Sequence, residues 1–295
     1  MKKKLLYIIN PISGTPRKNN IFEIISQYTD TDLFDFEIIK TQRAGHAFNL
    51  AQNAVSANYD VVVAVGGDGT LNEVGKALVG SNTLMGIIPK GSGNGLARFL
   101  KTPFITKKAV KIINSLNYRL MDTVKINECF YLNVAGIGFD AHIAHLFSKS
   151  ERRGFKIYAK LVLQEFRKYQ GQNYQLKIDG RELKLNNVFM LSFANSSQFG
   201  NNAHIAPLAE IDDGLIDLCI LKKFPDFRSP DIIFKLYSRR LIKSKFYKIH
   251  KAKKVELFAN SDLLGHVDGE PLNFGNKLLI EVVPKSLKVI NSIQK

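Results

Sequence analysis

The sequence has few cysteines, no long apolar run and few acidic residues. Its two cysteines, Cys129 and Cys219, lie far apart and lack neighbouring metal-ligand residues. This spacing predicts two buried thiols in a reducing cytosol and excludes a disulfide framework. No apolar run approaches the ~20 residues of a membrane span. The run Leu5 to Ile9, which follows three lysines, is shorter than a secretory signal needs. We therefore expect a soluble protein or one that is peripheral to a membrane.

The shortage of acids leaves a large positive charge. The chain has 42 Lys and Arg against 26 Asp and Glu, which gives a net charge of +16. Such an excess predicts an anionic partner: nucleic acid, a nucleotide or an anionic membrane surface. Charge alone does not choose among these three classes.

The first ~120 residues alternate between strand and helix patterns. Strand-like runs, each followed by a segment with helical spacing, occur at 4–10, 34–41, 61–65 and 84–89. Strands that alternate with helices predict a parallel, doubly wound α/β sheet.

From about residue 121 the pattern changes to short strand-like runs. Helical spacing interrupts them only near 155–169 and 231–242. Asp179-Gly180 and Asp268-Gly269 are signals of tight β-hairpin turns. The second half therefore predicts an antiparallel β-sandwich domain.

In the stretch VVVAVGGDGTLNEVGKAL, residues 61–78, a buried strand is followed by a glycine-rich turn and a helix. Glycines 66, 67 and 69 allow positive φ and let another molecule approach the main chain. Exposed amides in such a turn, at the N-terminus of a helix, favour a phosphate. Asp68 would repel that phosphate unless a cation lay between them, which predicts a bridging Mg²⁺. A tight turn without a ligand is the alternative.

Two similar turns follow other strands, Asn10–Gly14 after the first and Gly91–Gly95 after the fourth. Because parallel strands end at one edge of a sheet, three such turns predict one phosphate-binding crevice. The common nucleotide fingerprints G-x-x-x-x-G-K-[ST] and G-x-G-x-x-G are absent, and so are the protein-kinase elements H-R-D and D-F-G.

Seven motifs occur along the chain in this order: NPISG (10–14), GHA (45–47), GGDGTLNE (66–73), PKGSGNGLA (89–97), NVAGIGFDA (133–141), APLAEIDDGLIDL (206–218) and HVDGE (266–270). As an ordered set, they resemble the lipid kinases built on the diacylglycerol kinase catalytic domain. That family includes bacterial diacylglycerol kinases and the sphingosine and ceramide kinases. The resemblance implies a nucleotide-binding α/β domain over 1–120 and a β-rich lipid-substrate domain over 121–284. The tail 285–295 is expected to pack back onto the first domain.

The resemblance also implies an ATP site between the two domains and transfer of the γ-phosphate to a lipid hydroxyl. Diacylglycerol is the first expected acceptor, and phosphatidic acid the product. Glu270 matches the general base for the hydroxyl, and Asp68 matches the acid near the phosphates and Mg²⁺. The positions that match or adjoin the family's ATP contacts are Asn10, Pro11, Ile12, Ser13, Gly14, Thr41, Gly66, Gly67, Asp68, Gly69, Thr70, Leu71, Asn72, Glu73, Gly91, Ser92, Gly93 and Asn94.

Asp213, with the carbonyl groups of Glu210 and Leu215, matches a structural Mg²⁺ site of bacterial members. A plain acidic turn is the alternative for this segment, as an ordinary exposed turn glutamate is for Glu270. At Gly95 the sequence departs from diacylglycerol-type members, which usually carry an aspartate after the asparagine of this loop. The loop looks closer to the sphingosine and ceramide kinase version, so a sphingoid base or ceramide remains an alternative acceptor. NAD kinase and a non-catalytic lipid- or nucleotide-binding regulator are more distant alternatives.

A basic segment suggests where the excess charge is used. Between Lys222 and Lys254 there are twelve Lys or Arg against two acids, with Phe and Tyr interleaved. Such a segment suits anionic lipid headgroups, and a solvated basic face is the alternative. No nucleic-acid recognition motif accompanies the charge, so we expect no nucleic-acid partner. We expect a cytoplasmic protein at the inner face of the membrane, and the sequence leaves a homodimer open.

Overall fold

The computed structural model describes residues 1–13, 20–150 and 155–291. The chain divides into two compact units. Unit 1 consists of Met1–Thr123 and Pro284–Lys295, and unit 2 of Val124–Val283. Two strands, β5 (Tyr118–Ile126) and β15 (Lys277–Ile290), have residues in both units.

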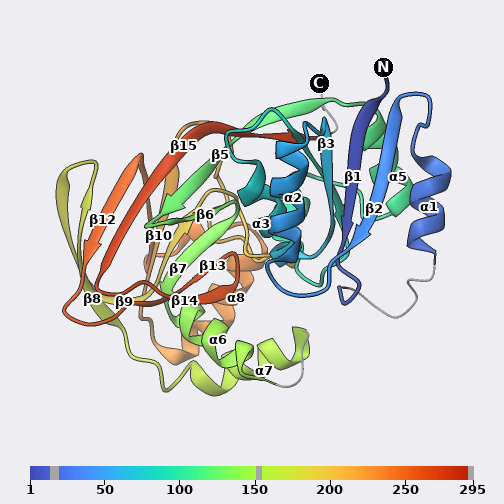
Figure 1. Cartoon of the computed structure of the whole chain (residues 1–295). Coiled ribbons are helices and arrows are strands. Elements are labelled where there is room, and N and C mark those ends of the chain that lie inside the picture. Colours follow the sequence, from blue (N-terminus) through green and yellow to red (C-terminus); the bar gives the residue numbers. More distant parts are fainter. Residues whose placement is uncertain (14–19, 151–154, 292–295) are drawn as a thin grey trace. The chain divides into compact units, whose positions relative to one another are not determined.

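Unit 1 contains a parallel sheet with helices on both faces (Figure 1). Its strands run in the order β15-β4-β3-β1-β2, and the four that lie wholly in the unit are β1 (Lys3–Ile9), β2 (Phe34–Lys40), β3 (Val61–Gly66) and β4 (Leu84–Pro89). Helices α1 and α5 lie on one side of these strands, and α2 and α3 on the other. The helices are α1 (Ile21–Tyr28), α2 (His46–Ser56), α3 (Asp68–Leu78), α4 (Gly95–Phe99) and α5 (Thr106–Asn114).

The helices on both faces explain the continuous apolar runs of the strands. Every residue of β3 is buried, as expected for a central parallel strand that is covered on two sides. The strand register pairs Ile9 with Val65, and Gly66 with Pro89. The loops that follow β1, β3 and β4 therefore leave the sheet at the same edge. The predicted parallel α/β sheet is confirmed.

Unit 2 is antiparallel, as predicted. Besides its part of β15 and the end of β5, its strands are β6 (Cys129–Tyr131), β7 (Val134–Gly138), β8 (Gln172–Ile178), β9 (Arg181–Ala194), β10 (Ile216–Lys222), β11 (Tyr247–Ala252), β12 (Lys254–Phe258), β13 (Leu264–Val267) and β14 (Glu270–Asn273). Its helices are α6 (Phe139–Ser148), α7 (Phe155–Glu165) and α8 (Ser229–Tyr237), and two short 3₁₀ turns flank α8, η1 (Asp226–Arg228) and η2 (Leu241–Lys243).

Side chains that alternate along β9 and β10 build two separate cores in unit 2. Leu191 and Phe193 belong to the core that lies inside the sandwich. Met190 and Ala194 belong to a second core, which also contains residues of α6 and α8. This alternation is the period-two pattern of a strand that is buried on both faces. Residues of α6 and α8 therefore pack directly on the sandwich.

Two local predictions can be compared with the structure. Asp179 and Gly180 form the predicted two-residue hairpin turn, with φ angles of 47° and 82°. The prediction that both cysteines are buried is wrong for Cys129, which is exposed. Cys129 lies on β6, a three-residue strand that pairs only with β5 among the described strands.

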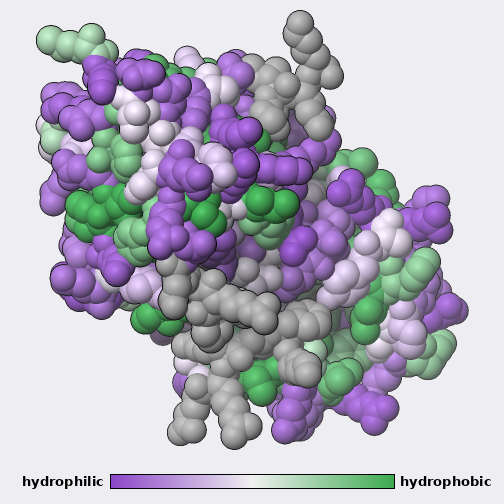
Figure 2. Space-filling view, turned by 90° about the vertical axis from the view of Figure 1, so that its right-hand side faces the viewer, coloured by the Kyte–Doolittle hydropathy of each residue, from purple (hydrophilic) through white to green (hydrophobic). Residues whose placement is uncertain are grey.

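The surface is mainly hydrophilic on the face that Figure 2 shows, where hydrophobic residues form small separate patches. Among the described residues, no helix has both the length and the apolar character that a membrane crossing requires.

Candidate functional site

Two of the three glycine loops of unit 1 touch each other through their backbones. A Cβ atom on Gly91 would lie 2.5 Å from the Cα atom of Gly67, and a Cβ on Gly67 would lie 3.0 Å from the Cα of Gly91. The Lys90 N–H also donates to the Gly66 carbonyl at 2.7 Å. Gly67 has a φ of −94°, and Gly66 and Gly69 are likewise outside the positive-φ region. The expectation of positive φ at these glycines is therefore wrong. Gly67 and Gly91 are needed instead because the two loops approach so closely that a Cβ atom at either position would crowd the backbone of the other loop.

Asp68 joins these same two loops. Its Oδ2 accepts a hydrogen bond from the Asn94 N–H at 2.8 Å, and its Oδ1 accepts one from the Gly95 N–H at 2.7 Å. The carboxylate thus caps the start of α4, where backbone N–H groups favour a negative charge. From the sequence, we predicted that Mg²⁺ alone offsets the negative charge of the Asp68 carboxylate. Two backbone donors of the neighbouring loop already share that role, and the contact with Mg²⁺ stays a prediction.

Asn94 shapes the third loop from inside. It is only 2% exposed and has a φ of 50°. Its Oδ1 accepts from the Gly91 N–H at 2.9 Å, and its Nδ2 donates to the Gly91 carbonyl at 2.6 Å. Within the predicted ATP set, Asn94 therefore has a role in fixing the loop conformation.

Two more residues of the predicted ATP set tie loops to helices. The Asn10 Nδ2 donates to the Thr70 Oγ1 at 3.2 Å and so links the first loop to α3. Glu73 accepts hydrogen bonds from the N–H groups of Gly45 and Ala47, at 2.9 and 3.0 Å, at the start of α2. This contact explains why the GHA segment accompanies the GGDGTLNE loop.

The candidate ATP residues differ in exposure. Gly66, Thr70, Leu71, Asn72 and Asn94 are buried. Pro11, Ile12 and Ser92 are exposed, and the half-buried members are Asn10, Ser13, Thr41, Gly67, Asp68, Gly69, Glu73, Gly91 and Gly93. Gly14 lies outside the described residues. Contacts with a nucleotide in unit 1 are therefore expected from the exposed and half-buried group.

We expect Gly91→Ala to separate the two loops, because its Cβ would collide with backbone that has no rotamer to change. Overpacking of this kind costs about 1–3 kcal/mol, which urea denaturation would detect. The graded control is Gly67→Ala, whose Cβ has more room and which should cost less. Equal stability of Gly91→Ala and wild type would contradict the loop contact.

In unit 2, Glu270 follows a tight turn at the start of β14. Val267 pairs with Glu270, and Asp268 and Gly269 between them have φ angles of 50° and 87°. These angles indicate the predicted two-residue hairpin turn. Glu270 itself is exposed.

Asp268 anchors this turn to the start of β7. Its Oδ1 accepts from the N–H groups of Asn133 and Val134, both at 2.9 Å, and its Oδ2 accepts from the Leu132 N–H at 3.1 Å. Hydrogen bonds to an ionised acceptor are stronger than neutral ones. The NVAGIGFDA and HVDGE motifs therefore form one structure, which holds the backbone beside Glu270.

A buried polar cluster supports the same turn from α6. The His266 Nε2 lies 3.0 Å from the Asp140 Oδ2, which also accepts from the Ser192 hydroxyl at 3.2 Å. The Gly269 N–H donates to the His266 Nδ1 at 3.4 Å, so Nε2 carries the ring proton and donates to Asp140. All three side chains are buried. Asp140 and His266 belong to the motifs NVAGIGFDA and HVDGE, but the sequence alone predicted no role for either residue.

We expect His266→Ala to lower turnover about tenfold, because the turn before Glu270 loses the acceptor for its Gly269 N–H. The KM for ATP should stay within about twofold, since the residues predicted to contact ATP lie in unit 1. A reduced stability with unchanged kcat would show that the cluster is only structural. Steady-state kinetics and urea denaturation on one preparation would separate these outcomes, and His266→Gln, which can still accept a hydrogen bond, should be less impaired.

The proposed second Mg²⁺ site has a protein cation beside it. The Asp213 Oδ2 forms an ion pair with Lys251, and its Oδ1 accepts from the Leu215 N–H at 3.0 Å. Burial raises the pKa of the nearby Asp217 carboxyl to about 6, and the charges of Asp213 and Glu210 act in the same direction. Within the described residues, no group of three or more His, Cys, Asp or Glu side chains could hold a metal ion. A metal at Asp213 would have to share the carboxylate with Lys251, and this site stays a prediction.

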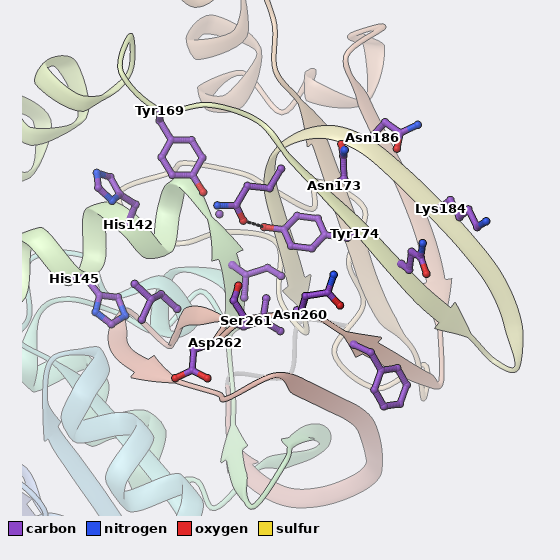
Figure 3. Close-up of a pocket in the computed structure, with 18 residues that line it drawn as sticks. His142, His145, Tyr169, Asn173, Tyr174, Lys184, Asn186, Asn260, Ser261 and Asp262 are labelled. Carbon is purple, nitrogen blue, oxygen red and sulfur yellow. Dashed lines mark hydrogen bonds between the residues drawn. The ribbon is translucent and has the colours of Figure 1, made fainter.

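Unit 2 also contains a cavity of about 860 Å³ (Figure 3). His142 and His145 reach it from α6, Tyr174 from β8 and Leu264 from β13. Its lining mixes apolar side chains with amides and with charged groups such as Lys184 and Asp262, and none of the described candidate site residues contributes to it. The His145 Nε2 donates towards the carbonyls of Gly265 and Leu272, at 3.0 and 3.3 Å, and so ties α6 to β13 and β14.

The motifs and the fold agree with two known protein domains. Residues 4–126 match the Diacylglycerol kinase catalytic domain, and residues 133–291 match the YegS C-terminal NAD kinase beta sandwich-like domain. The chain belongs to the diacylglycerol kinase catalytic-domain family. Its family is one of lipid kinases, as the resemblance of the seven motifs predicted.

Individual relatives are similar over most of the chain. A diacylglycerol kinase of Staphylococcus carnosus is 29% identical and aligns over 100% of both chains. A probable lipid kinase YegS-like of Chromohalobacter salexigens is 29% identical over 78% of this chain and 76% of its own. The crystal structure of a diacylglycerol kinase from Bacillus anthracis has a TM-score of 0.74 at 21% identity, and covers 99% of this chain and 97% of its own. That structure shares the fold.

Proposed function

We propose that this protein is an ATP-dependent lipid kinase that transfers the γ-phosphate of ATP to a lipid hydroxyl. Diacylglycerol is the proposed acceptor, which makes phosphatidic acid the product. The observation that supports this most strongly is the pairing of family membership with an exposed Glu270 on an anchored turn. A carboxylate in such a position is what a general base for a hydroxyl requires.

Unit 1 is proposed to bind ATP through its glycine loops. Phosphoryl transfer depends on position and charge stabilisation more than on covalent chemistry of the protein. The contact between Gly67 and Gly91, together with the hydrogen bonds of Asp68, holds two of these loops in one conformation. Mg²⁺ bound with ATP would neutralise charge on the phosphates, and the Asp68 carboxylate is the oxygen ligand that we assign to it.

Glu270 is proposed to orient the lipid hydroxyl and to accept its proton as the oxygen attacks phosphorus. Three buried groups, Ser192, Asp140 and His266, and the Asp268 carboxylate fix the turn before it. A fixed backbone reduces the freedom of the base and so favours a productive geometry.

The cavity of unit 2 is proposed to receive the acceptor lipid. It borders β13 at Leu264, three residues before Val267, which pairs with Glu270. Three residues of a strand span about 10 Å, a distance over which the glycerol and upper acyl segment of one lipid extend. The exposed apolar side chains of its lining, Phe258 and Leu264, would contact the acyl chain.

A panel of acceptors tests this function. The purified protein would be incubated with labelled ATP, Mg²⁺ and, in separate reactions, diacylglycerol, a sphingoid base, ceramide and NAD. We expect label in diacylglycerol. A sphingoid base or ceramide as the preferred acceptor would confirm a lipid kinase and correct the substrate, in line with Gly95. Label in NAD alone, or in no acceptor, would overturn the proposed function.

A further inference from the structure

Unit 2 exposes a group of large apolar side chains around α8. Five of them fall within residues 227–242, here called the α8 patch: Phe227 (76% exposed), Ile233 (49%), Phe234 (60%), Tyr237 (43%) and Ile242 (45%). Scattered exposed apolar residues are ordinary on a protein surface, but a concentration in one short segment marks an interaction site.

The helix itself shows why this patch is unusual. Ile232 and Leu236 of α8 pack into the core of unit 2, which accounts for one face of the helix. At 100° per residue, Ile233, Tyr237 and Phe234 fall within a single arc of about 100° on another face. A surface helix normally carries polar residues on the face away from the core. Packing within unit 2 therefore does not explain these three side chains.

Exposed cations lie within or next to the same segment of the sequence. They are Arg228, Arg239, Arg240, Lys243 and Lys245. The single acid within residues 227–242, Asp231, is paired with Lys235 at 2.8 Å. The guanidinium group of Arg228 lies over the Phe227 ring, 5.4 Å from its centroid. The segment thus combines exposed apolar side chains with exposed positive charges, here called the basic rim.

We propose that the α8 patch docks the protein on an anionic bilayer, with Phe227 and Phe234 inserted among the headgroups and the basic rim against phosphates. Apolar residues beside Lys and Arg are the composition that binds membrane interfaces. A second copy of this chain fits less well, because two such rims would repel each other. The proposal rests on the proposed function, since a lipid kinase must reach an acceptor held in a membrane.

The absence of tryptophan from the sequence allows a direct test. Phe234→Trp would place the chain's single Trp in the patch, and Phe104→Trp, an exposed site in unit 1 (43%), is the matched control. With vesicles that contain phosphatidylglycerol, we expect the Phe234→Trp emission to shift to the blue and to be quenched by brominated acyl chains. The Phe104→Trp emission should not change. The shift should weaken in high salt, because the Debye length falls from about 10 Å at 0.1 M to about 3 Å at 1 M.

A second variant separates docking from catalysis. Phe227→Ser with Phe234→Ser should reduce the fraction of protein bound to anionic vesicles severalfold, while phosphorylation of a soluble short-chain diacylglycerol stays within about twofold of wild type. No blue shift with anionic vesicles, or an equal shift with vesicles of phosphatidylcholine alone, would overturn the proposal. A shift that depends on protein concentration without lipid would assign the patch to a second copy. If the wild-type protein does not phosphorylate the soluble short-chain diacylglycerol, that result would instead count against the proposed function.

Discussion

Glu270→Gln is expected to lower kcat for lipid phosphorylation by about 10²–10⁴-fold, the usual contribution of general-base assistance. A lipid hydroxyl is a poor nucleophile, and the amide of Gln cannot accept its proton. Because Gln keeps the size and polarity of Glu, the free energy of unfolding and the affinity for ATP should change little. On the same preparation, steady-state kinetics would measure kcat, a nucleotide-binding titration the affinity for ATP, and urea denaturation the free energy of unfolding.

Glu128→Gln is the matched control for this experiment. Glu128 is a strongly exposed glutamate in unit 2, and its contact with Lys125 is a surface ion pair at 3.8 Å. Such pairs contribute little to stability, so the control should retain wild-type kinetics. A Glu270→Gln enzyme with the wild-type rate would show that this carboxylate is not the base. Loss of ATP binding in the variant would show a structural or nucleotide-contacting role.

Asp68→Asn is expected to reduce turnover about 10²-fold, the cost of displacing a reacting group by about 1 Å. The carboxylate accepts two backbone N–H groups, from Asn94 and Gly95. An amide can accept only one of them and points its own NH₂ group at the other. The third glycine loop should therefore shift relative to Gly67, and any contact with Mg²⁺ should weaken as well.

Unfolding experiments would show whether Asp68→Asn changes only the glycine loop or destabilises the whole of unit 1. The lost hydrogen bond should cost about 1–3 kcal/mol, which leaves unit 1 folded. Asp35→Asn, an exposed aspartate on β2, is the control and should change neither stability nor turnover. Near-normal turnover of Asp68→Asn would contradict the role of its carboxylate in placing the loop.

Local sequence patterns predicted the elements of the fold well. The apolar run at 61–65 and the helical spacing at 21–28 correspond to β3 and α1, because both patterns depend on residues close in sequence. The Asp268-Gly269 turn was predicted for the same reason, since the conformation of a two-residue turn depends on its own residues.

Long-range contacts could not be predicted in this way. His266 and Asp140 are 126 positions apart, and only the folded β13 and α6 bring them together. Likewise, Gly67 and Gly91 meet because β3 and β4 are neighbours in the sheet, and the sequence gives each glycine a second explanation in ligand binding. The exposed apolar face of α8 was not predicted, because the spacing of apolar residues along the helix does not show which of its faces packs against the core.

The transfer of label from γ-labelled ATP to a total lipid extract, in the presence of Mg²⁺, would test directly whether this protein phosphorylates a lipid. Wild-type protein should produce a labelled, chloroform-soluble product, and Glu270→Gln should produce at most about one hundredth as much. Identification of the labelled species would name the acceptor. No labelled lipid with the folded wild-type protein would rule out a lipid kinase, and equal labelling by Glu270→Gln would rule out Glu270 as its base.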